Sequence, residues 1–267
     1  MDEQAKSDVD TSVAASYRRQ FAGTSKAEEY DEIQYNPRSY SDVLWQIEQD
    51  QLVEIVDEFR HTHESIEYLD FAAGTGRIVA FMEDKVDQAT GIEISAAMVG
   101  RAQQKLRQSK LICSDITAEG AEIEGKYDFI TAFRFVLNAE PSLRQSGLEA
   151  LAARLRDKTS LLVFNNHGNF YSHKLLLWPF HKLHSLRKGY QTEGNYLTNG
   201  QVHRLARNAG LEITRTIGCG FLGGKVARFL PIKAATAIER GLARWRVFRP
   251  FGVNQLYIAR SAETMRH

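Results

Sequence analysis

The chain has 267 residues, of which 43% are hydrophobic and 25% charged, with a formal net charge of +1. This composition is that of an ordinary globular protein, and the length fits one large domain or a core with an added lobe. Two cysteines are too few for a disulfide framework and lack metal-ligand spacing, so we expect a reduced setting and no metal site. Because residues 1–20 lack a signal peptide and the apolar run 175–180 is too short to cross a bilayer, we expect a cytoplasmic protein.

The first regular element should follow a polar N-terminal segment, residues 1–40, which we expect to be a cap or partly disordered. Apolar residues at helical spacing then predict a helix that is capped by Ser41 and runs to about Phe59. Up to residue 165, short apolar runs alternate with amphipathic ones. The runs predict strands at 66–71, 88–94, 110–114, 127–133 and 160–165, and helices at 76–84, 95–107 and 142–156.

Strands separated by helices of this length indicate right-handed crossovers and a mainly parallel sheet. The pattern loosens over 166–198, which is typical of an irregular lid or substrate segment. Regularity returns over 199–267, with helices at 199–209 and 231–245 and strands at 211–218 and 254–260. We therefore predict an α/β fold: a Rossmann-like, doubly wound, mostly parallel seven-stranded sheet with helices on both faces and a small helical lid. The core of this fold should be residues 41–165, completed by 199–267.

Charge is distributed unevenly along the chain. Residues 1–60 hold 14 acidic and 6 basic side chains, whereas Lys225 to Arg260 hold 8 basic side chains and one acid, Glu239. A further basic stretch runs from Lys158 to Thr192. This uneven charge favours an anionic partner for the C-terminal part of the chain. The partner would be an anionic or lipid-linked substrate, or a membrane surface that the basic helix contacts. The alternative is a basic helix that only faces solvent.

The residues that close the predicted strands are the informative ones, because ligands of open parallel sheets bind at the carboxyl ends of the strands. Asp70 and the small-residue loop 72–76 close the first strand, Glu93 the second, and Asp115 follows the third. A small-residue loop entering a helix presents free amides, and an acid at the second strand end can accept both hydroxyls of a ribose.

Dinucleotide-binding enzymes share the loop and the second acid, so a nucleotide-dependent reductase is an alternative at this point. Two observations count against it. Val79 stands where a third small residue should let helix and strand approach, and Asp115 adds an acid suited to an adenine amino group.

The segment LDFAAGTGR (69–77) resembles the first motif of class I S-adenosylmethionine-dependent methyltransferases, with Ala72 where many members carry glycine. Three further segments resemble the motifs that follow in that family, in order and with ordinary spacing. They are GIEISAAMVGRAQQK (91–105), CSDI (113–116) and YDFITAFRFVLN (127–138). The resemblance implies the cofactor S-adenosylmethionine and a methyltransferase of small molecules or glycan intermediates.

Carried over residue by residue, the resemblance implies a set of cofactor contacts. Glu93 would hold the ribose hydroxyls, Asp115 the adenine amino group, and Asp70 the loop and the methionine amino group. The other implied contacts are Ala72, Gly74, Gly76, Ile94, Met98, Ile116, Phe133 and Arg134.

The acceptor is less well defined by the sequence. Methyltransferases that resemble this chain and act on exocyclic nitrogens carry an Asn/Asp-Pro-Pro-aromatic element at the end of the fourth strand. This chain has FRFVLN there, which favours oxygen as the target. His167, after the fifth strand, is the candidate general base, with His173, His181 and His184 further along. A non-catalytic cofactor-binding module and an RNA methyltransferase are the alternatives, although no RNA-binding module is evident and we expect no nucleic-acid partner.

Overall fold

The computed structural model describes residues 39–117, 125–172, 175 and 196–262. Within these ranges seven strands form one sheet in the order β3-β2-β1-β4-β5-β7-β6. The strands are β1 (Glu67–Phe71), β2 (Gln88–Glu93), β3 (Lys110–Cys113), β4 (Phe129–Ala132), β5 (Leu161–Asn166), β6 (Leu211–Cys219) and β7 (Asn254–Ser261). All pairs from β3 to β5 are parallel, and β7 runs antiparallel to both β5 and β6. The predicted fold, a doubly wound and mostly parallel seven-stranded sheet, is confirmed.

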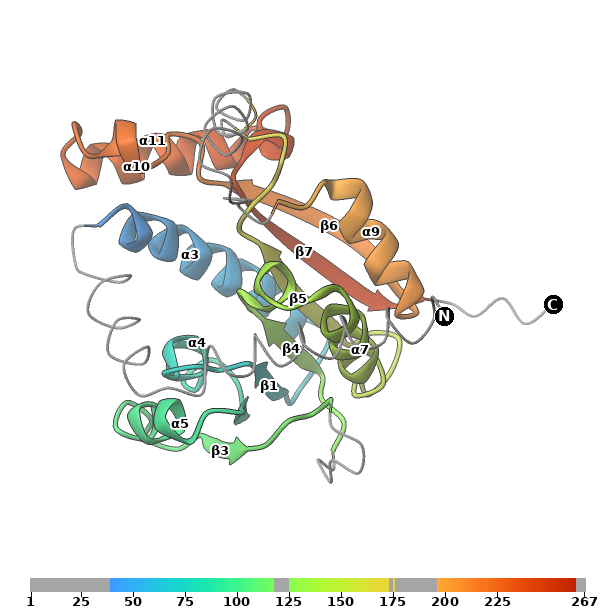
Figure 1. The fold of residues 1–267 in the computed structure, drawn as a ribbon. Coiled ribbons are helices and arrows are strands. Elements are labelled where there is room, and N and C mark those ends of the chain that lie inside the picture. The colour runs from blue at the N-terminus through green and yellow to red at the C-terminus, as the bar shows by residue number, and fades with distance from the viewer. Residues whose placement is uncertain (1–38, 118–124, 173–174, 176–195, 263–267) are drawn as a thin grey trace, which may run out of the picture.

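Helices cover both faces of this sheet (Figure 1). On one side lie α3 (Tyr40–Arg60), α4 (Arg77–Met82) and α5 (Ala96–Gln103), and α11 (Ile232–Arg244) packs against α3. On the other side lie α7 (Pro141–Ala152) and α9 (Asn199–Asn208). The remaining described helices are short: α6 (Phe135–Asn138), α10 (Gly224–Ala227) and the 3₁₀ turn η1 (Arg249–Phe251).

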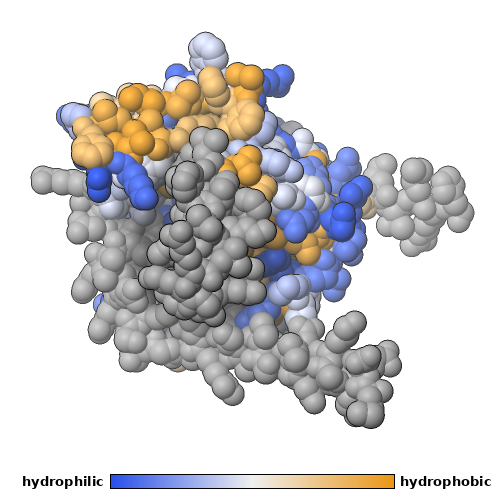
Figure 2. All heavy atoms as spheres, turned by 45° about the horizontal axis from the view of Figure 1, so that its top comes forward, coloured by the Kyte–Doolittle hydropathy of each residue, from blue (hydrophilic) through white to orange (hydrophobic). Residues whose placement is uncertain are grey.

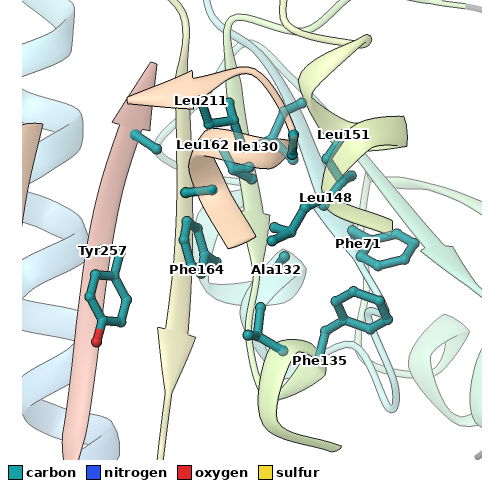
Figure 3. Close-up of a cluster of buried hydrophobic side chains, with 14 of the residues drawn as sticks. Phe71, Ile130, Ala132, Phe135, Leu148, Leu151, Leu162, Phe164, Leu211 and Tyr257 are labelled. Carbon is teal, nitrogen blue, oxygen red and sulfur yellow. The ribbon is translucent and has the colours of Figure 1, made fainter. Parts of the chain in front are cut away.

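Each face of the sheet has its own apolar core, because successive side chains of a strand point to opposite faces. Leu69 and Phe71 of β1 join the core beneath α7 and α9, where Phe71 meets Phe135 edge-on (Figure 3). Tyr68 of the same strand joins the core beneath α3 and α4. The sheet is therefore buried on both faces, and its edge at the carboxyl ends of the strands is left for a ligand.

One local prediction needs correction. The cap of α3 is Ser39, whose Oγ accepts from the Asp42 amide, and not Ser41, which lies within the helix. The turn 218–224 is fixed by Glu239, whose carboxylate accepts hydrogen bonds from the amides of Gly220, Phe221 and Leu222 at 2.8–3.1 Å. The short helices α6 and α10 were not predicted.

Other expectations lie largely outside the described residues. These are the polar N-terminal segment, most of the lid 166–198, and the histidines His173, His181 and His184.

The junction between β1 and α4 depends on Gly76. Its φ is +80°, which side-chain-bearing residues rarely adopt, and a Cβ there would lie 2.8 Å from the Cβ of Ala102 in α5. We expect Gly76→Ala to lower the free energy of unfolding by about 2 kcal/mol, from left-handed backbone strain and overpacking together. Urea unfolding measures this change.

Gly100 provides the matched control on α5. A Cβ at Gly100 meets nothing within 4 Å, so Gly100→Ala should raise the free energy of unfolding by about 0.5–1 kcal/mol. Equal effects of the two substitutions would contradict the packing seen between α4 and α5.

Candidate cofactor site

A cavity opens at the carboxyl ends of the strands, where the chain order of the sheet reverses between β1 and β4. Such a switch point is where open α/β sheets bind ligands. The residues that follow β1, β2, β3 and β4 line the cavity together. Of the residues predicted to contact a cofactor, the cavity brings together Asp70, Ala72, Gly74, Glu93, Ile94, Met98, Asp115, Ile116, Phe133 and Arg134.

Gly76 is the exception, because it does not line the cavity. It begins the turn into α4 and faces Ala102, so its small size serves the packing of two helices. The resemblance to class I methyltransferases had grouped it with the other small residues of the loop.

The loop after β1 offers bare backbone to the cavity. Ala72 and Gly74 both have left-handed backbones, with φ of +55° and +57°. A Cβ built at Gly74 would have only the Ala72 oxygen and the Met98 Sδ near it, both at 4.0 Å. An elongated ligand can therefore approach the main chain closely at this loop.

Glu93 closes β2 beside this loop and is 5% exposed. Its Oε2 accepts from the Gly74 amide and its Oε1 from the Ser95 amide, both at 2.9 Å. Burial raises the pKa of the Glu93 carboxyl, while these amides oppose the rise. Since each carboxylate oxygen can accept more than one hydrogen bond, the oriented group can still accept a pair of hydroxyls from a ligand.

Asp115 also lines the cavity and follows β3. Its Oδ1 accepts from both the amide and the hydroxyl of Thr117, at 2.9 and 2.6 Å, which fixes the orientation of the carboxylate. An acid held in this way beside the apolar side chains of Ile94, Met98 and Ile116 suits a planar, apolar ring that carries an amino group.

Asp70 is the penultimate residue of β1, beneath the loop, and is 2% exposed. It accepts from the Thr131 hydroxyl at 2.8 Å and from the Val79 amide in α4 at 3.1 Å. Burial raises the pKa of the Asp70 carboxyl to about 7; Thr131, Arg77 and the Val79 amide oppose the rise and Glu93 adds to it. Asp70 thus ties the loop to α4 and titrates near neutrality.

This raised pKa gives a prediction for stability. In the unfolded chain the Asp70 carboxyl ionises near pH 4, so its stabilising contribution is full below that pH and is lost as the pH rises to about 7. From pH 5 to pH 8 we expect the wild type to lose about 3 kcal/mol of unfolding free energy relative to Asp70→Asn, which cannot ionise. Urea unfolding of both proteins across this range measures the difference. A difference that stays constant with pH would contradict the assignment.

A buried polar network that the sequence pattern did not predict lies beneath Arg134. The Arg134 backbone is left-handed, with φ of +59°, and its amide donates to Asn165 Oδ1 at 2.6 Å. Asn165 in turn donates to Asn254 Oδ1, and Asn254 donates to Glu48 of α3 at 2.6 Å. The floor of the cavity is therefore held from α3, β5 and β7. Two asparagines within an otherwise apolar strand, 161–166, were the available signal.

Arg77 is a second residue that the prediction missed. It lines the cavity, its guanidinium lies 4.0 Å from the centre of the Trp45 ring, and its Nη1 lies 3.6 Å from Glu48 Oε2. This arrangement places a fixed positive charge near the Asp70 carboxyl.

His167, the predicted base, directly follows β5 and is half-buried. It is not among the residues that line the cavity. The structure thus places it at the carboxyl edge of the sheet and outside the walls of the cofactor cavity. Among the described residues, no group of three His, Cys, Asp or Glu side chains could hold a metal ion.

These features define a nucleotide-type cofactor site in the topology of class I methyltransferases. The residues present fit S-adenosylmethionine: bare backbone for its methionine end, a buried acid at the second strand for its ribose, and a third acid among apolar side chains for its adenine. Residues 44–216 match the family described as Methyltransferase domain. The chain belongs to this methyltransferase family, and the predicted enzyme class, an S-adenosylmethionine-dependent methyltransferase, is confirmed.

Solved structures share the fold at low sequence identity. Magnesium protoporphyrin IX methyltransferase from Synechocystis PCC 6803 with bound SAH has a TM-score of 0.59 and 16% identity, covering 93% of this chain and 99% of that one. An S-adenosylmethionine-dependent methyltransferase from Clostridium acetobutylicum has a TM-score of 0.53 and 15% identity, covering 89% of this chain and 98% of that one. No curated protein sequence matches the chain.

Proposed function

We propose that the protein transfers a methyl group from S-adenosylmethionine to an oxygen of a small-molecule acceptor that is anionic or lipid-linked, in a cytoplasmic setting. One observation carries the cofactor part of this proposal: acids from three neighbouring parallel strands and a bare loop line a single cavity. The two described cysteines, Cys113 and Cys219, are free thiols, which supports the cytoplasmic setting.

The proposed roles follow from the position of each residue. Glu93 accepts from the ribose hydroxyls, and Asp115 accepts from the adenine amino group. Ala72 and Gly74 lie along the methionine part, and Asp70 holds this loop and attracts the methionine ammonium. The apolar ring contacts and the floor near the sulfonium come from Ile94, Met98, Ile116, Phe133 and Arg134.

Catalysis then depends mainly on alignment. The cofactor supplies a methyl group that is already activated on a sulfonium. What the protein must do is exclude water and hold the acceptor oxygen in line with the methyl group, which can contribute several kcal/mol. The rigid floor at Arg134, fixed through Asn165, supports such alignment.

His167 is the proposed general base. It follows β5 at the same edge of the sheet as the cavity, and an imidazole titrates near neutral pH, so it can take the proton from an acceptor hydroxyl. The sequence FRFVLN at the end of β4, which lacks the Asn/Asp-Pro-Pro-aromatic element, supports oxygen rather than an exocyclic nitrogen.

The experiment is incubation of the native protein with a cell extract and isotopically labelled S-adenosylmethionine, followed by mass spectrometry. We expect label in an anionic or lipid-soluble small molecule, as an O-methyl group, and a loss of transfer by His167→Gln with unchanged cofactor affinity. Binding without transfer would instead indicate a non-catalytic module. Label on nitrogen or in RNA would overturn the acceptor class.

A further inference from the structure

The segment between β6 and β7 forms a distinct surface at the carboxyl edge of the sheet. β6 is parallel to β5, because β7 runs antiparallel to both, so the end of β6 at Cys219 lies at the same edge as the cofactor cavity. The chain leaves the sheet there, forms α10, α11 and η1, and returns into β7 at Asn254. In Figure 1 this segment stands at the top of the molecule, with α10 and α11 above α3.

This segment exposes an unusual concentration of large apolar side chains. Among the described residues, seven of the ten exposed large hydrophobic residues lie between 226 and 251. Phe229 is 75% exposed and Trp245 is 65% exposed. We call this surface the apolar face; its members are Val226, Phe229, Ile238, Trp245, Val247, Phe248 and Phe251. Figure 2 shows apolar residues gathered over α10 and α11.

Helix α11 has no large apolar residue among its buried side chains, although Ile232 packs partly buried against the core. Its buried side consists of small or polar residues, namely Ala235, Thr236, Glu239 and Ala243. Its outward side includes the exposed Ile238, and exposed Trp245 follows directly. Such an arrangement leaves bulky apolar groups in water unless something covers them.

The apolar face is also held in place. Glu239 is fully buried and binds three amides of the β6–α10 turn, and the Tyr40 hydroxyl donates to it at 2.5 Å. Arg240 pairs with Asp50 of α3 at 2.6 Å. The backbone that carries the exposed side chains is therefore anchored by buried hydrogen bonds, which are costly to break.

Charge around the apolar face is positive. Basic residues flank it, and five of them are exposed and make no ion pair with a described acid: Lys225, Arg228, Lys233, Arg244 and Arg246. The one acid of the segment, Glu239, is buried, and Asp50 on the neighbouring helix is engaged by Arg240. What the segment presents to a partner is apolar and cationic.

We propose that this face docks on the surface of an anionic lipid bilayer. Exposed Trp and Phe beside Lys and Arg are the composition of interfacial membrane helices, whose apolar groups enter the headgroup boundary while the cations meet anionic lipid. A second copy of the chain fits less well, because a two-fold contact would place these cations against one another. Among the described residues, none of the helices has the length and apolar content of a membrane span.

The docked orientation also follows from the fold. Since the apolar face and the cofactor cavity share the carboxyl edge of the sheet, docking turns the edge that holds the cavity toward the lipid surface. The inference itself stands apart from the proposed reaction, because lipid binding is measured without cofactor or acceptor.

Cosedimentation of the full chain with vesicles tests the proposal. With vesicles of phosphatidylcholine and phosphatidylglycerol we expect binding that weakens at high salt, and with phosphatidylcholine alone at least tenfold weaker binding. Trp245 emission should shift to the blue on binding, and Trp245→Phe should remove the shift. The variants Phe229→Ser with Phe251→Ser, and Arg244→Glu with Arg246→Glu, should each lower the partition coefficient about tenfold or more.

The matched control is Arg204→Glu with Arg207→Glu on α9, which reverses the same charge on another exposed helix and should bind like the wild type. Thermal unfolding checks that each variant folds, and the aromatic and arginine pairs test the face independently. Equal loss in the control pair, or no binding to anionic vesicles, would overturn the proposal. So would light scattering that shows a dimer which the aromatic variants dissociate.

Discussion

Replacing Glu93 with alanine is expected to weaken S-adenosylmethionine binding about 100-fold. The carboxylate is buried at the end of β2, and amide hydrogen bonds from Gly74 and Ser95 orient it toward the cavity. A hydrogen bond to a charged acceptor contributes roughly 1.5–3 kcal/mol, and about 3 kcal/mol corresponds to about 100-fold in Kd. The variant also leaves the Gly74 amide without its acceptor, which loosens the loop. Isothermal titration calorimetry measures the change in Kd.

Two further variants sharpen this test. Glu93→Gln keeps the shape and one acceptor oxygen, so its affinity should fall between those of the wild type and the alanine variant. Glu212→Ala removes an exposed acid of β6 far from the cavity and should leave the Kd unchanged. If the Kd of Glu93→Ala is unchanged while circular dichroism shows an intact fold, Glu93 does not bind the cofactor.

The second large effect is expected at Glu239, in the stability of the fold. Its carboxylate accepts from the amides of Gly220, Phe221 and Leu222 and from the Tyr40 hydroxyl, at 2.5–3.1 Å. Truncation to alanine leaves these donors without their acceptor inside the protein, and a buried unsatisfied group costs roughly 1–3 kcal/mol. We expect Glu239→Ala to lower the free energy of unfolding by about 4 kcal/mol, a large share of the usual 5–15 kcal/mol of a domain. Urea unfolding measures this loss.

Glu239→Gln is the informative companion variant. It retains one acceptor oxygen and the side-chain volume, so its loss should be clearly smaller than that of Glu239→Ala. On the same helix, Lys233→Ala removes an exposed charge and should change stability by no more than about 0.5 kcal/mol. A loss for Glu239→Ala as small as that for Lys233→Ala would contradict the buried role of this acid.

Much of the cofactor site could be predicted, because its residues stand at strand ends and strand ends are visible in the sequence. Asp70, Glu93 and Asp115 each follow a short apolar run, and the parallel topology brings those runs to one edge. Gly76 was predicted less well. A small residue in the loop indicates that another group lies close to the backbone, but only the fold shows that this group is Ala102 of α5 and not the cofactor.

The parts that could not be predicted depend on contacts between distant segments. Glu239 lies among basic residues and resembles a surface acid, yet its partner Tyr40 is 199 positions away. The network from Glu48 to Asn165 and Asn254 likewise joins three elements that no local pattern connects. The prediction of the α3 cap was wrong for a simpler reason. Ser39 and Ser41 are both residues that suit an N-cap, and the spacing of the apolar residues does not distinguish between them.

The most direct test of the central claim is calorimetric titration of the native protein with S-adenosylmethionine, with NADH titrated in parallel. We predict one S-adenosylmethionine bound per chain, displaced by S-adenosylhomocysteine, and no heat from NADH. Absence of S-adenosylmethionine binding by the folded protein, or saturable binding of NADH in its place, would contradict the account.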